Sequence, residues 1–384
     1  MAHLADPTMT TVVLVSRPER AALREAERTR GELAELGVSN LRLALNGVFV
    51  AEVAGDAIAD AMTARGQEAL AQMPAGLAAL PTSETPLMAL GTVGLDALRM
   101  LSKGTTSTPA QMGALEPIDL PGSLDPLIDE IAASGHGLVM TMGKGGVGKT
   151  TVAAHIAVEL ARRGHKVTLS TTDPAAHVHY AVAEDIPGLT VTRIDPVEEL
   201  ATYREEVMAK AGANLDPSGH AMLEEDLRSP CTEEIAIFRA FARTVDEGAG
   251  QFVVLDTAPT GHTILLLDAA ESYHREVLRT QTEMPESVKA LLPRLRDPAF
   301  THAIIVTLAE ATPVHEAERL QKDLVRAGIK PFAWVINQSL LASGTAHPLL
   351  MQRGAQERGF IEQVRFGLAS RCVLIPWGSV GLTQ

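Results

Sequence analysis

Nine residues near the middle of the chain have the types and the spacing of a phosphate-binding loop. They satisfy the pattern G-x-x-x-x-G-K-[ST] and are Gly143, Lys144, Gly145, Gly146, Val147, Gly148, Lys149, Thr150 and Thr151. Glycines let backbone N–H groups approach phosphate oxygens closely, Lys149 supplies a charge to the outer phosphates, and the Thr150 hydroxyl is a ligand for Mg²⁺. The pattern predicts a nucleotide site.

Two carboxylates and a further lysine extend this constellation. Asp256 ends the apolar run Phe252–Leu255, where it is either an ordinary strand-end residue or a ligand that reaches Mg²⁺ directly or through water. Asp173 follows the run 166–171, where it either caps the next helix or orients an attacking water. Lys144 precedes the usual lysine of the loop, and we interpret it as a second phosphate contact. Two lysines and a water-orienting carboxylate suit phosphoryl transfer, in which a protein chiefly positions reactants and neutralises charge.

The loop needs a strand before it and a helix after it, and the sequence predicts both. The apolar run Leu138–Met142 reads as a buried strand and Val152–Arg163 as a helix. Further predicted strands are 166–171, 189–194, 252–256, 303–308, 332–337 and 372–376, and the helices between them are 198–211, 233–247, 313–327 and 352–366. Such alternation predicts an α/β fold with a mostly parallel sheet and helices on both faces, as in P-loop NTPases.

The chain before the loop divides into an α/β segment and a linker. Strands are predicted at 10–16 and 41–50 and helices at 19–36, 56–72 and 93–101. Residues 103–123 are rich in Thr, Ser, Pro and Gly and have no periodicity, which is typical of a linker. We therefore predict a partial first unit over 1–102, a linker over 103–123, and a second unit over 124–384 that is slightly short at its C-terminus.

The two units contain an internal repeat. A shift of 291 positions aligns Thr10–Asn46 with Thr301–Asn337 without a gap, and the run EAER occurs in both. Ungapped identity that ends on the same Asn favours duplication over chance. The first copy begins after the place where a phosphate loop would stand, so residues 1–102 read as the tail half of one unit that lacks its P-loop.

Composition narrows the class of protein. The 384 residues are 46% hydrophobic, which suits a folded core, and the net charge of −14 argues against a nucleic-acid partner. Two cysteines exclude a disulfide framework and suit a reducing cytosol. No run approaches ~18 uncharged apolar residues, and the N-terminus has no signal pattern. We expect a cytoplasmic location.

The loop with two lysines, Asp173–His177, Arg228–Ala236 and Asp256–Thr263 together resemble the arsenical pump ATPase family. That family belongs to the deviant-Walker-A class, with nitrogenase iron protein, the partitioning ATPases and the tail-anchored-protein targeting ATPase. It has two homologous halves joined by a linker. The resemblance covers essentially the whole chain and implies an ATPase, an N-terminally truncated soluble motor of arsenite or antimonite efflux.

The resemblance also implies roles for single residues. Lys149 and the loop amides hold ATP, Thr150 and Asp256 hold Mg²⁺, and Asp173 orients the hydrolytic water. Lys144 reaches a nucleotide across an interface with a second ATPase unit in trans, which a homodimer can supply. The adenine is read by Asn337, with Pro376 as a weaker candidate, and Asn46 is the orphaned counterpart of Asn337.

A metalloid site is implied at Cys231, His262 and Ser229, since a soft thiolate suits As(III) or Sb(III) as an allosteric ligand. The alternative for Cys231 is a small buried apolar residue, which is how we interpret Cys372. The family's first half supplies a further phosphate loop and thiolates that this chain lacks. Implied partners are a membrane arsenite efflux permease, which would place the protein at the inner face of the membrane, and an arsenic metallochaperone.

Two other functions stay open. A tail-anchored-protein targeting or positioning ATPase would act as a nucleotide-gated binding module, and the targeting relative should carry a C-x-x-C zinc pair and a Met-rich groove. This sequence has no C-x-x-C, and its 13 Met are scattered. The other alternative is a catalytically idle fragment, because Lys144 has no target unless two chains pair.

Overall fold

The computed structural model describes residues 2–52, 55–89, 95, 99, 119–172, 186–212, 215–257 and 285–378. Its contacts divide the chain into two compact units. One unit comprises Met1–Asp119 with Gln338–Gly359 and Pro376–Gly378, and the other comprises Leu120–Asn337, Phe360–Ile375 and Ser379–Gln384. Most of the predicted linker falls outside the described residues, so the predicted division at 103–123 stays a prediction.

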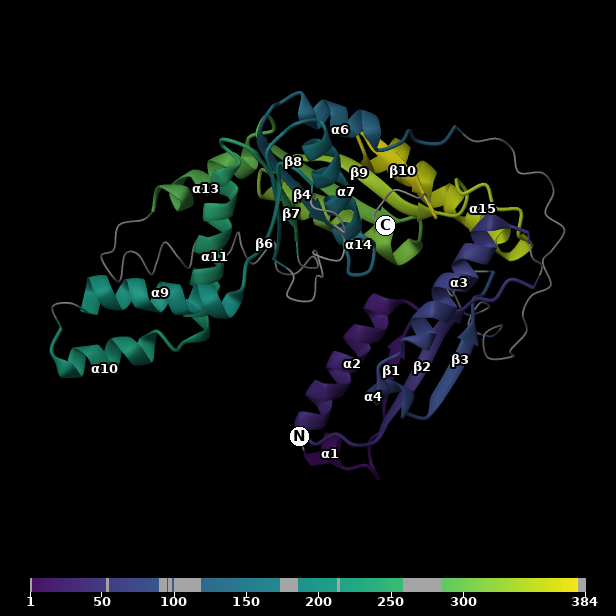
Figure 1. Ribbon diagram of the computed structural model, residues 1–384, viewed down its shortest axis with the longest axis horizontal. Coiled ribbons are helices and arrows are strands. Elements are labelled where there is room, and N and C mark those ends of the chain that lie inside the picture. The colour runs from purple at the N-terminus through teal and green to yellow at the C-terminus, as the bar shows by residue number, and fades with distance from the viewer. Residues whose placement is uncertain are drawn as a thin grey trace. The chain divides into compact units, whose positions relative to one another are not determined.

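The larger unit is built on a seven-stranded sheet (Figure 1). The strands, in their order across the sheet, are β10 (Cys372–Pro376), β9 (Pro331–Ser339), β8 (Thr301–Leu308), β4 (Gly137–Met142), β7 (Phe252–Asp256), β5 (Val167–Thr171) and β6 (Leu189–Arg193). The pairs from β9 to β6 are parallel. Strands β4, β5 and β7 consist entirely of buried residues, as expected of central strands covered on both faces. The predicted fold class is confirmed.

Helices cover both faces of this sheet (Figure 1). On one face, α6 (Asp125–Ala132) and α7 (Lys149–Arg162) form a core with alternate strand residues such as Val139, Val254 and Val306. Helix α14 (Ala311–Arg326) packs on the other, where Gln321 accepts a hydrogen bond from the indole nitrogen of Trp334 at 2.6 Å. The other helices of this unit in the described residues are α9 (Pro196–Ala211), α10 (Pro217–Asp226), α11 (Pro230–Glu247) and α13 (Glu286–Arg296). Helix α15 (Pro348–Gln363) belongs to the smaller unit up to Gly359 and to the larger unit from Phe360. A π-helix follows it over Val364–Leu368.

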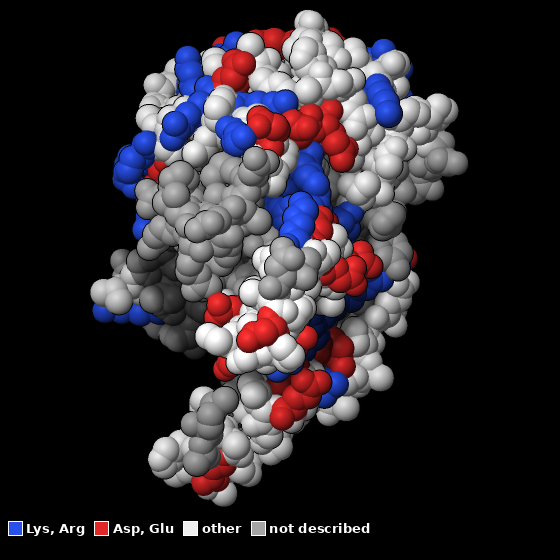
Figure 2. All heavy atoms as spheres, turned by 90° about the vertical axis from the view of Figure 1, so that its left-hand side faces the viewer, with Lys and Arg blue, Asp and Glu red and all other residues white. Residues whose placement is uncertain are grey.

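Ion pairs join the outer helices to one another. Arg239 of α11 lies 2.7 Å from Glu206 of α9, and Arg243 pairs with Glu199 on the same two helices. Figure 2 shows Lys and Arg side chains interspersed with Asp and Glu on the face that it views. None of the helices in the described part of the chain is long and apolar enough to span a membrane.

The smaller unit contains a three-stranded parallel sheet in the order β1 (Val12–Ser16), β2 (Leu41–Val48) and β3 (Thr82–Pro86). Helices α1 (Ala2–Ala5), α2 (Arg20–Glu35), α3 (Ala57–Ala71) and α4 (Ala75–Ala78) belong to the part of this unit that the structure describes. Leu14, Leu43 and Leu45 on one face of the sheet pack with Leu23 of α2 and Leu77 of α4. Strand β3 was not predicted, because its sequence TSETP has no apolar alternation.

The internal repeat is also a repeat of structure. Adding 291 to the bounds of α2 gives the bounds of α14. The register repeats too, since Val13 pairs with Arg42 and Ile304 pairs with Ala333 at the same offset. After each helix a glycine, Gly37 or Gly328, has a φ of 82°. The two segments therefore share the same strand–helix–strand geometry.

The smaller unit includes a segment from late in the chain. The carboxylate of Asp56 caps α3 through Ala59 N and also accepts hydrogen bonds from Thr345 Oγ1 at 3.0 Å and His347 N at 3.2 Å. Phe49 and Ala59 form an apolar cluster with Leu340 and Leu350. The carboxylate of Asp56 thus joins segments that are 289 positions apart.

Candidate functional site

The phosphate loop lies between the central strand β4 and helix α7, as the sequence predicted. Gly143 has a φ of 149°, and a Cβ there would lie 2.2 Å from the carbonyl oxygen of Val306 on β8. Gly148, the N-cap of α7, has a φ of 90°, and a Cβ there would lie 2.2 Å from the side-chain nitrogen of Asn337. Neither position has room for a side chain, because the loop backbone lies close to the neighbouring strands.

The start of α7 is favourable for an anion. The first N–H groups of a helix have no partner within the helix, and its macrodipole places partial positive charge there. No acidic residue lies in the first turn of α7. Lys149 begins the helix, is buried, and donates from Nζ to the Lys144 carbonyl oxygen at 3.2 Å. The lysine charge and the helix start therefore meet at the loop, a combination that suits phosphate.

Thr150 and Asp256 lie side by side beneath this loop. The Thr150 hydroxyl donates to Asp256 Oδ2 at 2.7 Å, and Asp256, at the end of β7, is only 1% exposed. Thr171, at the end of β5, also lies within 3.4 Å of Oδ2. A hydroxyl and a carboxylate in contact at the carboxyl edge of a parallel sheet form the oxygen donor set that Mg²⁺ takes beside a phosphate. The residues present fit Mg²⁺.

The side chain of Asn337 contacts the phosphate loop through a hydrogen bond. Asn337 lies near the end of β9, is 3% exposed, and donates from Nδ2 to the carbonyl oxygen of Val147 at 2.9 Å. The family resemblance implies adenine recognition for this residue, and no pattern in the sequence indicates its contact with the loop. The assignment to adenine stays a prediction. Pro376 ends β10, and its predicted role is likewise untested.

Three threonines at strand ends were missed in the sequence. Thr257 donates to the carbonyl oxygen of Thr141 at 2.8 Å, which fixes the first residue after β7 against β4. Thr171 donates to the carbonyl oxygen of Asp256 at 3.3 Å. These threonines could have been predicted as neighbours of the site, because parallel strands place their last residues at one edge of the sheet.

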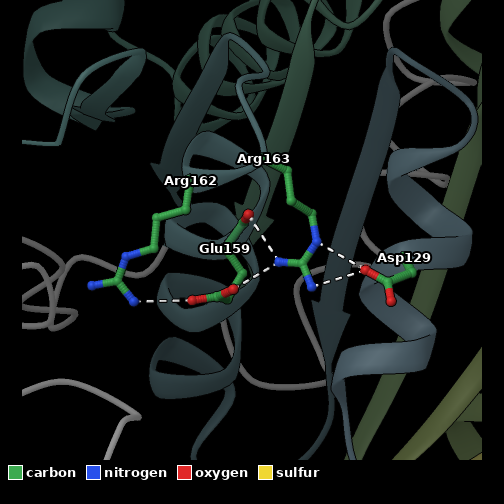
Figure 3. Close-up of polar contacts among 4 residues, drawn as sticks. All are labelled: Asp129, Glu159, Arg162 and Arg163. Atoms are coloured by element: carbon green, nitrogen blue, oxygen red, sulfur yellow. Dashed lines mark hydrogen bonds and ion pairs between the residues drawn. The ribbon is translucent and has the colours of Figure 1, made fainter.

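Helix α7 is held in place at its far end by a cluster of charges (Figure 3). Arg163 donates to Glu159 Oε2 at 2.7 Å and to Asp129 of α6 at 2.9 Å, and Arg162 donates to Glu159 at 3.0 Å. Burial disfavours the charged form of Glu159, but the hydrogen bonds from Arg162 and Arg163 outweigh it and lower its pKa. The cluster links the C-terminal end of α7 to α6.

The predicted metalloid residues are only partly covered by the structure. His262 lies outside the described residues, as does Asp173, the residue expected to orient the hydrolytic water. Cys231 is the second residue of α11, but its side chain is not among those described, and the Ser229 hydroxyl lies 3.1 Å from that of Thr232. No group of three or more His, Cys, Asp or Glu residues suited to a metal occurs in the part of the chain that the structure describes. The roles of Ser229, Cys231 and His262 stay predictions.

Cys372 lies in strand β10, as predicted. Burial of its thiol raises its pKa to about 12, an effect that the nearby Arg365 only partly offsets. A thiol with so high a pKa carries almost no thiolate at neutral pH and is a poor ligand or nucleophile. This agrees with the interpretation of Cys372 as a structural residue.

Comparison with known proteins places these features in one family. A family model described as "Anion-transporting ATPase" matches residues 1–106, 136–281 and 266–369. An arsenical pump-driving ATPase of Escherichia coli is 49% identical over 377 residues, which cover 97% of this chain and 64% of the relative. A putative arsenical pump-driving ATPase of Aquifex aeolicus is 31% identical over 58% of this chain and 86% of the relative, and the ATPase get3 of Schizosaccharomyces pombe is 23% identical over 64% and 85%. The chain spans just under two thirds of the length of the E. coli relative.

Proposed function

The chain belongs to the anion-transporting ATPase family, and we propose that it hydrolyses ATP in a Mg²⁺-dependent reaction. The contact of 2.7 Å between the Thr150 hydroxyl and Asp256, next to Lys149 at the start of α7, carries the proposal. The side chains of Lys149 and Asp256 are 6% and 1% exposed, although each bears a charge. Burial of a charge is costly unless partners compensate it. Such an arrangement favours a site for phosphate and a divalent cation over a structural role.

Each residue of the site has a defined task in this proposal. The loop amides and Lys149 hold the terminal phosphates, while the Thr150 hydroxyl and Asp256 hold Mg²⁺. The bound cation neutralises charge on the phosphate oxygens. The hydrogen bond from Asn337 to the Val147 carbonyl oxygen holds the loop in position. Asp173 would orient the attacking water, and Lys144 would contact a nucleotide bound to a second unit.

We further propose that the ATPase is stimulated by As(III) or Sb(III) and drives metalloid efflux. The name "Arsenical pump-driving ATPase" of relatives that are 48–49% identical supports this. Cys231 would supply a soft thiolate, with His262 and Ser229 as further candidate ligands. The partners in this proposal are an arsenite efflux permease in the membrane and an arsenic metallochaperone.

Phosphate release by the purified chain, with and without antimonite, tests both proposals. We expect turnover that requires Mg²⁺ and rises with antimonite. The rise should be lost in Cys231→Ala and kept in Cys372→Ala, the matched control for removal of a thiol. Stimulation that is unchanged in Cys231→Ala would remove Cys231 from the metalloid site. Absence of turnover at saturating Mg-ATP would refute the ATPase itself.

Pairing of two chains is tested by the same assay across protein concentrations. If Lys144 acts on the nucleotide of a second chain, turnover per chain falls on dilution, and Lys144→Ala lowers it at high concentration. Turnover that depends neither on concentration nor on Lys144 would contradict pairing.

The second candidate function is a nucleotide-gated targeting ATPase. The similarity to ATPase get3 favours it, at 23% identity against 49% for the arsenical pump-driving relative. The two functions differ in their ligands. Retention of apolar tail peptides in an ATP-dependent manner, together with no response to antimonite, would select the targeting function.

A further inference from the structure

One carboxyl group that binds three donors has no task in the proposed site. Glu357 of α15 accepts hydrogen bonds from Ser339 Oγ at 2.6 Å, Leu340 N at 2.9 Å and Leu341 N at 3.1 Å. Withdrawal of the carboxyl group from solvent raises the pKa of Glu357, although these hydrogen bonds and the charge of Arg353 act in the opposite direction. A carboxylate in such surroundings is costly unless it is well bonded. The three donors offset that cost, and they tie α15 to the end of β9.

Helix α15 approaches the same backbone closely one turn earlier. Gly354 stands three residues before Glu357, so both lie on one face of the helix. A Cβ at Gly354 would lie 2.8 Å from the backbone nitrogen of Leu341 and 3.1 Å from the carbonyl carbon of Leu340. The helix therefore has no room for a side chain at this position, and its backbone lies directly against the residues that Glu357 binds.

The residue just before this contact has a strained backbone. Gln338 has a φ of 57°, and within the described ranges it alone among the residues other than glycine has a positive φ. The left-handed conformation is unfavourable for a residue with a Cβ and persists only where the neighbours hold it. On one side, Asn337 pairs with β8. On the other, Ser339 donates from its hydroxyl to Glu357, and its carbonyl oxygen accepts from the Trp377 N–H at 2.9 Å.

The strained residue adjoins the side chain that contacts the phosphate loop. Asn337 donates from Nδ2 to the Val147 carbonyl oxygen at 2.9 Å, and a Cβ at Gly148 would lie 2.2 Å from the same nitrogen. The contact leaves little clearance. Relaxation of Gln338 to an extended φ would rotate the peptide group that joins it to Asn337, and the amide would then leave its position against the loop. The place of the Asn337 amide therefore depends on the backbone that follows it.

We propose that Glu357 is a positioning residue for the phosphate loop. It binds residues 339–341 and so keeps Gln338 in the left-handed conformation and the Asn337 amide on Val147. Gly354 lets α15 come close enough for this contact. Glu357 thus acts through Asn337 and not on the nucleotide. The proposal rests on the nucleotide site proposed above, because a displaced loop alters function only if the loop binds phosphate.

The isosteric substitution Glu357→Gln tests the proposal. Each carboxylate oxygen accepts a backbone N–H, from Leu340 or from Leu341, so a side-chain NH2 group at this position faces a donor in either orientation. We expect the Kd for inorganic triphosphate, measured by calorimetric titration with Mg²⁺, to rise between about threefold and tenfold, the upper limit being the loss expected for Asn337→Ala. In the Asn337→Ala background Glu357→Gln should change this Kd less than about twofold, because the contact through which it acts is already absent.

Two glycines of α15 provide a matched pair of variants. Gly354→Ala should raise the Kd for triphosphate about threefold or more, since its methyl group has no room against the backbone of Leu341. Alanine favours a helix more than glycine does, so a weakened helix does not explain such a loss. Gly359→Ala is the control, because a Cβ there meets nothing within 4 Å, and the affinity should not change.

Hydrogen exchange in the ligand-free chain separates this proposal from the function of the site. Amides of the peptide that contains residues 143–151 should exchange at least about threefold faster in Glu357→Gln and in Asn337→Ala than in the wild type. If this pattern occurs but the wild type binds no triphosphate, the proposed nucleotide site fails and the positioning role stands.

Three results would overturn the positioning role. In the first, triphosphate binds but Glu357→Gln changes neither its Kd nor the exchange of the loop. In the second, the losses of affinity from Glu357→Gln and Asn337→Ala add. In the third, Asp56→Asn, which removes another carboxylate that binds the segment after β9, has the same effects and so assigns them to general loss of stability. We expect Asp56→Asn to lower the melting temperature and to leave both readouts unchanged.

Discussion

The side-chain amide of Asn337 donates a hydrogen bond of 2.9 Å to the carbonyl oxygen of Val147, 190 positions earlier in the chain. The end of β9 thereby holds the middle of the phosphate loop, although β8 lies between β9 and the strand from which the loop emerges. The geometry of the loop thus depends on a strand far from it in sequence.

Removal of this amide should weaken binding of any phosphate chain. A single hydrogen bond to a buried partner contributes about 1–1.5 kcal/mol, which corresponds to roughly a tenfold change in Kd. We expect Asn337→Ala to weaken the binding of ATP and of inorganic triphosphate by similar factors in calorimetric titration. Asn46→Ala, the exposed counterpart, is the control and should change neither. If Asn337 reads adenine instead, ATP alone will bind more weakly.

The Thr150 hydroxyl should be required for Mg²⁺-dependent turnover. Thr150→Val keeps the shape of the side chain and removes the hydroxyl that contacts Asp256, so we expect kcat to fall about 100-fold, the scale seen when one group that stabilises developing charge is lost. Thr150→Ser keeps the hydroxyl and should keep most of the activity. The measurement is phosphate release across a Mg²⁺ titration. Equal activity of the Val and Ser variants would exclude a role for this hydroxyl.

The charge cluster on α7 should make stability depend on pH in a defined direction. The pKa of Glu159 is lower in the folded chain than its ordinary value of 4.5, because the hydrogen bonds from Arg162 and Arg163 outweigh burial. Its contribution is therefore present above about pH 4.5 and is lost as the pH falls through the folded-state pKa. Glu159→Gln should reduce the free energy of unfolding by about 1 kcal/mol at pH 7, and the difference from the wild type should shrink towards pH 3.5. Urea titrations at the two pH values provide the measurement, and a difference that stays constant would contradict it.

Cys372 should be inert towards thiol reagents in the folded chain. Its pKa of about 12 leaves almost no thiolate at pH 8. In a Cys231→Ala background, which isolates this thiol, we expect negligible reaction with an aromatic disulfide reagent until denaturant is added, and then one equivalent. Rapid reaction under native conditions would show that β10 opens readily.

The sequence was sufficient for features that rest on local pattern. The strand, loop and helix around Lys149 were predicted because the glycine pattern and the apolar run specify them without reference to distant residues. Asp256 was placed beside Thr150 because both stand at the carboxyl edge of one parallel sheet. The helix begins at Lys149 instead of the predicted Val152, since Gly148 in the left-handed region already serves as the N-cap.

The remaining features depend on tertiary contacts that a single sequence does not encode locally. Strand β3 is held by its pairing with β2 and has an exposed polar sequence, so no periodicity marks it. The contact of Asn337 with Val147 requires the register of β8 with both β4 and β9. The segment after β9 packs with residues near Asp56, and this also follows from no pattern in either stretch.

The two-sided cap formed by Asp56 has a consequence for the order in which the chain folds. Asp56 leaves the ribosome before Thr345 and His347, which lie 289 and 291 positions later. Its carboxylate can accept their hydrogen bonds only after these residues have been made. Contacts over such separations form slowly, because a long loop must close before they stabilise anything. The unit that contains Asp56 is therefore completed only after the chain has been made through His347, and until then Phe49 lacks the apolar contacts that Leu340 and Leu350 provide.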